Sequence, residues 1–321
     1  MSFTAGPLAA LTWLGRRGTQ ALAVSTLIGV ALPPLAALLK PLFASTLFVL
    51  LALAFLRVEP GDMRRHVVKP GLVLAATGWT MLAVPALCAA GLAFFRGAEP
   101  VPGLSVALIF QTAAPPIMSS PALIALTGLD ASLSLVTLIA CTALTPLTAT
   151  LFASLVIGPA LGISAVALGI KLLLMLAGAA VVATLIRRAT GAAWIERQSE
   201  RIDGLNVIAL FVFVVALMDG VAANAIAHPI LVIGLLALAF ALALGLATLT
   251  ALMFAPAGWW TALTLGFAAG SRNMGLMLAA AAGAVPDIVW LYFGLAQVPI
   301  YLMPQLLRLL VQRLPPRANA R

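Results

Sequence analysis

Long apolar runs separated by short polar segments fill the chain, and this pattern restricts the folds open to it. The hydrocarbon core of a bilayer, about 30 Å thick, is crossed by about 20 helical residues at a rise of about 1.5 Å each. Ten runs qualify, near residues 19–39, 41–57, 70–95, 104–127, 131–157, 163–187, 204–220, 229–255, 259–283 and 287–312. Of the 321 residues 63% are hydrophobic and only 8% are charged, against about 25% charged in soluble domains. The sequence therefore predicts an all-α polytopic membrane protein with ten transmembrane helices in a single domain, residues 1–321.

The positions of lysine and arginine indicate how these helices are oriented. Most of the 18 basic residues lie in four segments, namely the N-terminus, the second loop, the sixth loop and the tail: Arg16, Arg17, Arg57, Arg64, Arg65, Lys69, Arg187, Arg188, Arg197, Arg201, Arg308, Arg313, Arg317 and Arg321. With ten spans these segments share one side, and the other side holds only Lys40 and Arg96. The positive-inside rule then places both termini in the cytoplasm.

Composition also bears on location and partners. Arginine far outnumbers lysine and alanine is abundant, as in GC-rich bacterial genes, so we expect the bacterial cytoplasmic (inner) membrane. The basic residues occupy short loops and form no stripe with interleaved aromatics, so the bilayer, and no nucleic acid, is the expected partner. The first run is longer than the apolar region of a signal peptide, and we expect it to be retained.

Two runs are interrupted near their middle by residues that disfavour helices. These residues are Pro115, Pro116 and Pro121 in the fourth run, and Gly266, Gly270 and Gly275 in the ninth. Both runs end in a glycine, Gly128 or Gly283, with an aspartate shortly after. The runs lie five spans apart, an odd number, which predicts inverted repeats at about 19–157 and 163–312. Paired discontinuous helices in inverted halves are typical of the substrate site of a transporter.

Polar side chains gather around both breaks. A break frees backbone amides and carbonyls, which then need polar surroundings. We therefore take as candidate substrate-binding residues the polar groups near the breaks and one glutamine midway along the tenth run: Gln111, Thr112, Ser119, Ser120, Ser271, Arg272, Asn273 and Gln297. For each residue alone, a kink in a packed helix or a hydrogen bond within or between helices is the alternative.

The motifs at the breaks are similar to those of a known transporter family. In the ninth run "AAGSRNMGL" matches the typical E-x-G-x-Q-N-S-G-L at Gly270, Asn273, Gly275 and Leu276. In the fourth run "PPIMSS" is similar to P-G-G-T-A-S-N at Pro115, Ser119 and Ser120, and the fifth run shares an S…P pattern at Ser134 and Pro146. The chain thus resembles the bile acid:sodium symporter family, within the bile acid, arsenite and riboflavin transporter superfamily.

The resemblance implies an architecture. Spans 3–5 and 8–10 would form a core subdomain, and spans 1, 2, 6 and 7 a panel. The discontinuous helices 4 and 9 would cross near the membrane centre, with substrate bound in the crevice between core and panel.

The chain departs from the family where sodium would bind. Ala268 stands in place of the sodium-ligating glutamate, and Arg272 in place of the glutamine. A guanidinium offers five donors and no acceptor, so both changes remove oxygen ligands and one adds a positive charge. We expect no metal site, and expect Arg272 to supply the charge of a bound cation and to hold an anionic group of the substrate.

Other charged residues in or near the runs carry weaker expectations. Arg272 lies about 11 to 13 residues from either end of its run, too deep for easy snorkelling to the headgroups. Lys171 lies nearer an end, so snorkelling and function are both open. Asp219 and His228 border the short seventh loop, where a solvated face is the alternative to protonation chemistry.

We expect a secondary transporter of a small organic anion, a carboxylate, that works by alternating access and is sodium-independent or weakly sodium-coupled. The alternatives are a sodium-coupled bile-acid-like symporter and a non-transporting membrane receptor or channel-like protein. We expect no enzyme and no cofactor, because the two histidines and nine acidic residues form no reactive motif. We expect a monomer.

The charge asymmetry predicts the result of a reporter-fusion experiment. Alkaline phosphatase fused after Glu99 should be active, because that loop faces outward, and a fusion after Asp62 should be inactive. The reverse pattern would contradict both the span count and the inverted repeat.

Overall fold

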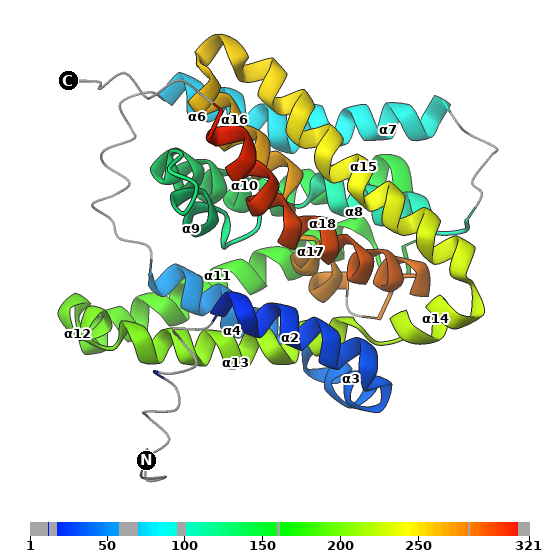
Figure 1. Cartoon of the computed structure of the whole chain (residues 1–321), viewed down its shortest axis with the longest axis horizontal. Coiled ribbons are helices and arrows are strands. Elements are labelled where there is room, and N and C mark those ends of the chain that lie inside the picture. The colour runs from blue at the N-terminus through cyan, green and yellow to red at the C-terminus, as the bar shows by residue number, and fades with distance from the viewer. Residues whose placement is uncertain are drawn as a thin grey trace. The chain divides into compact units, whose positions relative to one another are not determined.

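The computed structural model describes residues 12, 18–57, 70–94, 101–158, 161–281 and 283–313. Every regular element in these ranges is a helix (Figure 1), so the predicted all-α class is confirmed. Several basic residues of the topology argument lie outside the described residues: Arg16, Arg17, Arg64, Arg65, Lys69, Arg96, Arg317 and Arg321.

The helices of the first half of the chain are α2 (Gly18–Ala31), α3 (Pro33–Leu39), η1 (Lys40–Leu42), α4 (Phe43–Leu56), α6 (Pro70–Gly78), η2 (Trp79–Ala83), α7 (Val84–Phe94), α8 (Leu104–Ala113), α9 (Ser120–Ala125), α10 (Ala131–Phe152) and η3 (Ala153–Ile157). Those of the second half are α11 (Ala165–Thr190), α12 (Ala192–Arg197), α13 (Ser199–Leu217), α14 (Val221–Ala227), α15 (Pro229–Phe254), η5 (Ala255–Ala257), α16 (Trp259–Gly270), α17 (Met274–Ala281) and α18 (Asp287–Val311).

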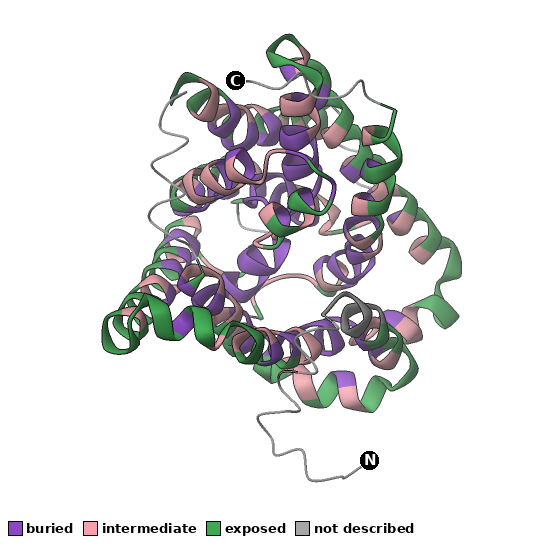
Figure 2. Ribbon diagram, turned by 60° about the vertical axis from the view of Figure 1, so that its left-hand side comes forward, coloured by how far each residue is buried: buried purple, intermediate pink, exposed green. Residues whose placement is uncertain are grey.

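Seven helical segments of the described chain are long and apolar enough to cross a membrane: Pro33–Leu56, Pro70–Phe94, Ala131–Ile157, Ala165–Thr190, Ser199–Ala227, Pro229–Ala257 and Asp287–Val311. Six of them fall on the predicted runs 70–95, 131–157, 163–187, 204–220, 229–255 and 287–312. The long helices carry apolar side chains on exposed sides as well as buried ones, as Ile230 and Ile233 of α15 do; Figure 2 shows buried and exposed residues on opposite sides of the same helices. The structure is therefore consistent with a multi-pass membrane protein, and the count of ten spans stays a prediction.

The first two predicted runs divide at a different residue from the expected one. The prediction places the boundary between 19–39 and 41–57 at Lys40, but the helical segment Pro33–Leu56 continues through this residue as the turn η1. The interruption lies instead at Leu32, with φ −122° and ψ 71°. A residue before proline is driven out of the helical region by the proline ring, and Leu32 precedes Pro33.

The two predicted discontinuous helices are observed. The run 104–127 is split into α8 and α9 by residues 114–119, and the run 259–283 is split into α16 and α17 by residues 271–273. Gly128 and Gly283, which follow α9 and α17, have similar left-handed φ values of 78° and 75°. The inverted symmetry itself stays a prediction.

The chain divides into two compact units. Unit 1 consists of Met1–Val58 and Leu173–Pro229, and unit 2 of Glu59–Leu172 and Ile230–Arg321. Unit 1 contains the first, second and seventh predicted runs and most of the sixth, whereas unit 2 contains the other runs and residues 163–172 of the sixth. The core and panel subdomains stay a prediction.

In unit 1, α13 packs against α2 and α4. The rings of Phe43 and Phe213 stack with centroids 4.9 Å apart. Lys40 Nζ donates to Asp219 Oδ2 at 2.9 Å, and Arg57 pairs with Asp203. An ion pair therefore lies at each end of the packing between the helical segment 40–57 and α13, each worth at most about 1 kcal/mol because its side chains are partly exposed.

In unit 2, α16 packs closely against α15 at a glycine. A Cβ added at Gly270 would lie 2.5 Å from the carbonyl oxygen of Ala243, 2.8 Å from Met303 Cε and 2.9 Å from Ala247 Cβ. Backbone atoms form part of this contact, so the helices would have to move apart. Gly270 is also the last residue of α16, so this close contact lies directly before the break.

We predict that Gly270→Ala destabilises the protein by about 1 to 3 kcal/mol, as overpacking does. The matched control is Gly245→Ala in α15, where an added Cβ meets nothing within 4 Å. The control should be neutral or stabilising, since alanine favours helices over glycine. Thermal unfolding of both variants measures this, and equal melting temperatures would contradict the close contact.

Candidate functional site

The two breaks in unit 2 meet and hydrogen-bond to each other. Ile117 N donates to the carbonyl of Ser271 at 2.9 Å, and Asn273 N donates to the carbonyl of Pro115 at 2.7 Å. Pro116 and Arg272 are thereby paired as an antiparallel bridge. Pro115 and Pro116 have no backbone N–H to donate within a helix. The unwound backbone of each broken helix therefore forms hydrogen bonds with the unwound backbone of the other. We call this junction the crossing.

Each broken helix presents both kinds of helix end at the crossing. α8 ends at Ala113 and α16 ends at Gly270, whereas α9 begins at Ser120 and α17 at Met274. Helix C-termini carry a partial negative charge of about half a unit, and N-termini an equal positive one. The crossing therefore joins two C-terminal ends that favour a cation and two N-terminal ends that favour an anion.

The Arg272 guanidinium lies at the C-terminal ends. Its Nε donates to the carbonyl of Ala269 at 2.6 Å, and its Nη1 donates to the carbonyls of Ala114 at 3.0 Å and Thr80 at 3.2 Å. The residue is only 1% exposed. Its Nη2 is buried and has no hydrogen-bond partner among the described residues. Three carbonyls from three chain segments thus surround one fixed cation.

The Thr80 carbonyl comes from an irregular turn that the sequence analysis missed. η2 is a single π-helical turn in the third span, and Pro85 follows it. Since proline has no N–H, a carbonyl of the preceding turn lacks its intrahelical donor, and the Thr80 carbonyl accepts from Arg272 instead. A proline one turn after a threonine-rich stretch is a weak signal in a sequence, because such prolines also occur in ordinary kinks.

The charges balance on the side of the crossing where Arg272 and the C-terminal ends of α8 and α16 lie. Two helix C-termini contribute about one negative charge between them, and Arg272 contributes one positive charge. Placing an arginine mid-membrane costs about 2.5 to 3.5 kcal/mol, and hydrogen bonds to a charged group return about 1.5 to 3 kcal/mol each. The three carbonyl contacts are therefore enough to keep the guanidinium inside.

Most of the other predicted site residues are near the breaks but already have partners. Gln111 accepts a hydrogen bond from the Tyr292 hydroxyl of α18. The Thr112 hydroxyl donates to the carbonyl of Leu108 at 2.8 Å. Tyr292 was missed, because nothing in the sequence links a tyrosine of the tenth run to the fourth.

Two further candidate residues, Ser120 and Gln297, also form hydrogen bonds within the protein. The hydroxyls of Ser120 and Ser134 lie 3.0 Å apart, which joins the fourth and fifth spans at residues that the family resemblance singled out. Gln297 Nε2 donates to the carbonyl of Phe293, one turn before it, at 3.4 Å. Both contacts favour helix packing as the role of these side chains in this structure.

Two predicted residues lie on the accessible side of the crossing. Ser119 is exposed and directly precedes α9, and Asn273 is half-buried and directly precedes α17. Asn273 Oδ1 accepts from Leu276 N at 3.3 Å, as a residue capping a helix N-terminus does. Ser271 is buried, and its hydroxyl has no partner among the described residues.

The other charged or titratable residues singled out in the sequence, Lys171, Asp219 and His228, lie outside the crossing. Lys171 is exposed on α11, and His228 is exposed after α14. Asp219 is paired with Lys40, so a structural role accounts for it. Within the described ranges, no three side chains of His, Cys, Asp or Glu gather as metal ligands would.

We predict that Arg272→Gln loses about 1 to 3 kcal/mol of stability, because buried carbonyls are left without a hydrogen-bond donor. The variant leaves the carbonyls of Ala269, Ala114 and Thr80 without their cation. Sodium should then raise the melting temperature of Arg272→Gln but not that of the wild type. Arg272→Lys, which keeps a charge, is the control and should not respond. An equal sodium response in all three proteins would refute the role of Arg272 as a built-in cation.

No protein-family model matches the chain, and no curated protein matches it. The resemblance described above therefore rests on span layout and short motifs, and the family and the function are proposals.

Proposed function

We propose that the protein is a secondary transporter of a small organic anion, a carboxylate, that works by alternating access without sodium. The observation that carries the proposal is the crossing, where two broken helices pair through their unwound backbones around the buried guanidinium of Arg272. The protein would lie in the bacterial cytoplasmic membrane as a monomer, with both termini in the cytoplasm.

Broken helices are uncommon in a membrane for a physical reason. Unwound backbone in the hydrocarbon layer is tolerated only where it is satisfied by protein or lines an aqueous cavity. Two such breaks, in runs five spans apart, meet at one point in unit 2. Paired half-helices of this kind are what transporters use to bind substrate near the midplane.

The C-terminal and N-terminal helix ends at the crossing would interact with different charges. Arg272 neutralises the buried C-terminal ends of α8 and α16. The N-terminal ends of α9 and α17, flanked by Ser119 and Asn273, remain to attract negative charge. An anionic substrate would meet these ends from the accessible side, and a direct contact to the unpartnered Arg272 Nη2 stays a prediction.

The side chains at the crossing also favour independence from sodium. Ala268 is an apolar side chain, 2% exposed, where the family that the chain resembles has a carboxylate, and the hydroxyls of Ser120 and Ser134 lie within hydrogen-bonding distance of each other. A cation that is part of the chain cannot dissociate during transport, so it cannot couple transport to a gradient of that ion.

The test is uptake into vesicles. Purified protein is first screened with small mono- and dicarboxylates by thermal shift, and the carboxylate that stabilises it most is then offered in radiolabelled form to proteoliposomes. We expect saturable uptake that is unchanged when choline replaces sodium. Abolition of uptake by choline would indicate a sodium-coupled symporter, and binding without uptake would indicate a receptor.

The same carboxylate tests whether Arg272 touches substrate. Direct contact predicts that Arg272→Gln weakens binding about 30-fold or more, because a charged partner is lost from a desolvated site, with Arg272→Lys intermediate. A purely structural arginine predicts unchanged dissociation constants per folded molecule, with only the melting temperature reduced.

A further inference from the structure

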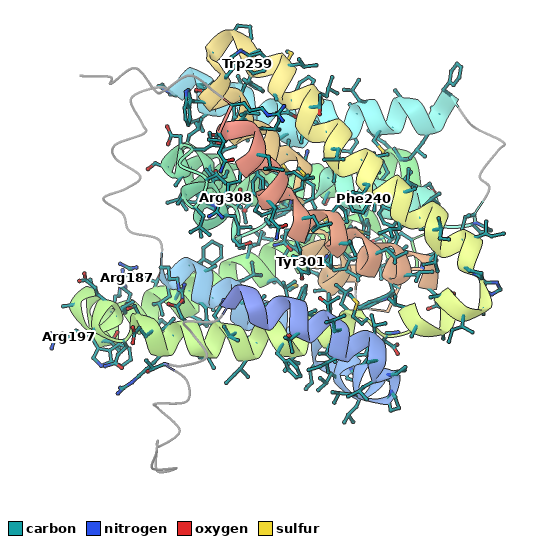
Figure 3. The ribbon with its side chains drawn as sticks, viewed as in Figure 1. Arg187, Arg197, Phe240, Trp259, Tyr301 and Arg308 are labelled. Atoms are coloured by element: carbon teal, nitrogen blue, oxygen red, sulfur yellow. The ribbon has the colours of Figure 1, made fainter. Side chains whose placement is uncertain are left out.

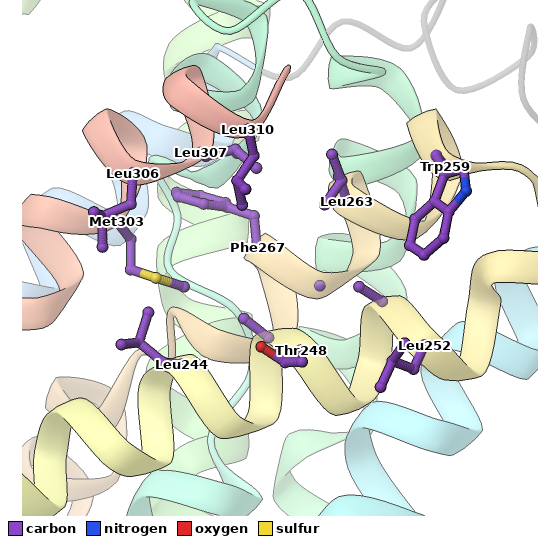
Figure 4. A pocket seen from close by; sticks show the side chains of 13 residues that line it. Leu244, Thr248, Leu252, Trp259, Leu263, Phe267, Met303, Leu306, Leu307 and Leu310 are labelled. Atoms are coloured by element: carbon purple, nitrogen blue, oxygen red, sulfur yellow. The ribbon is translucent and has the colours of Figure 1, made fainter. Parts of the chain in front are cut away.

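A groove on unit 2 lies among α15, α16 and α18 (Figure 4). Its volume is about 350 Å³. Leucine, alanine, phenylalanine and methionine side chains make up most of its wall, and the hydroxyl of Thr248 and the indole of Trp259 are the polar groups in it. Such a wall suits a hydrocarbon chain and offers almost nothing to a polar ligand.

The groove is open along the side of α15. Leu252 is 59% exposed and Trp259 is 50% exposed; Figure 3 labels Trp259 at the start of α16. Trp259 begins α16 and Leu310 lies in the last turn of α18, and their neighbours Trp260 and Val311 pack against one apolar cluster that includes Phe267. Tryptophan favours the interface between headgroups and hydrocarbon, which places the Trp259 end of the groove at the level of the headgroups.

A positive charge lies just beyond Leu310, the last lining residue of α18. Arg313 follows Leu310 by three residues, and its backbone N–H donates to the carbonyl of Leu310 at 3.1 Å. Its side chain is exposed, and within the described residues it makes neither a hydrogen bond nor an ion pair. An apolar groove with an unpaired arginine close to its interfacial end is complementary in polarity and charge to an anionic phospholipid.

We propose that the groove holds one acyl chain of an anionic phospholipid whose phosphate is bound by Arg313. A guanidinium binds phosphate oxygens at two points, and each basic residue near an anionic membrane surface contributes about 1 kcal/mol to lipid binding. The acyl chain lies against Leu306 and Leu310 of α18 and against Thr248 of α15.

The seated chain also contacts the helix that leads to the crossing. Gly266 and Phe267 line the groove, and they precede Ala269, whose carbonyl holds Arg272. The lipid therefore supports α16 directly before its break. Its effect on transport rests on the proposed function, but its binding does not.

The probe is phosphatidylglycerol with a photoactivatable diazirine in one acyl chain, mixed into phosphatidylcholine vesicles with the full-length protein. Cross-linked positions are identified by mass spectrometry. We expect them to concentrate in residues 244–252 of α15 and 303–310 of α18. A phosphatidylcholine analogue should label these residues about fivefold less, and Arg313→Gln should lower phosphatidylglycerol labelling by a similar factor.

Matched variants separate a seated lipid from the surrounding bilayer. At about 100° per residue, Arg308 projects from the side of α18 away from Leu306 and Leu310, so Arg308→Gln should leave groove labelling unchanged. Thr248→Trp fills the groove and should abolish labelling, whereas Leu249→Trp, on the neighbouring exposed position, should not. Labelling spread evenly over exposed helices, or unaffected by Thr248→Trp or by Arg313→Gln, would overturn the proposal whether or not the protein transports an anion.

Discussion

The hydrogen bonds between the Arg272 guanidinium and three backbone carbonyls join three irregular segments of unit 2. The carbonyls belong to the end of α16, the break after α8 and the π-turn η2. Each of these segments lacks a full set of intrahelical hydrogen bonds, and each would be unfavourable in hydrocarbon by itself. One side chain satisfies all three, and this explains why a chain with so few charges keeps a charge in the middle of a span.

The breaks were predictable because their causes are local. Pro115 and Pro116 cannot donate in a helix, and the glycines of the ninth run disfavour one, so the sequence alone located both interruptions. Arg272 was conspicuous for the same reason, since a charge far from both ends of an apolar run demands a partner. Its partners could not be predicted, because backbone carbonyls leave no mark in a sequence and any residue type can supply one.

Other features depended on contacts between distant segments. The hydrogen bond from Tyr292 to Gln111 joins the tenth and fourth spans, and the pairing of Ser120 with Ser134 joins the fourth and fifth. These contacts use polar groups that were expected to face a substrate. The division of the first two runs was misplaced for a simpler reason, because the conformational restriction that Pro33 imposes on Leu32 outweighs the charge of Lys40 as a helix boundary.

Because the cation at the crossing is covalently attached, its presence there does not depend on the concentration of a free ion. A dissociable ion stabilises a folded protein by an amount that rises with the ion's concentration relative to its dissociation constant, so such a site weakens when the salt is removed. The guanidinium of Arg272 has an effective concentration set by its covalent attachment to the chain, the same in dilute detergent solution as in the cell. The crossing should therefore keep its geometry through purification at low ionic strength, without any added salt to supply its cation.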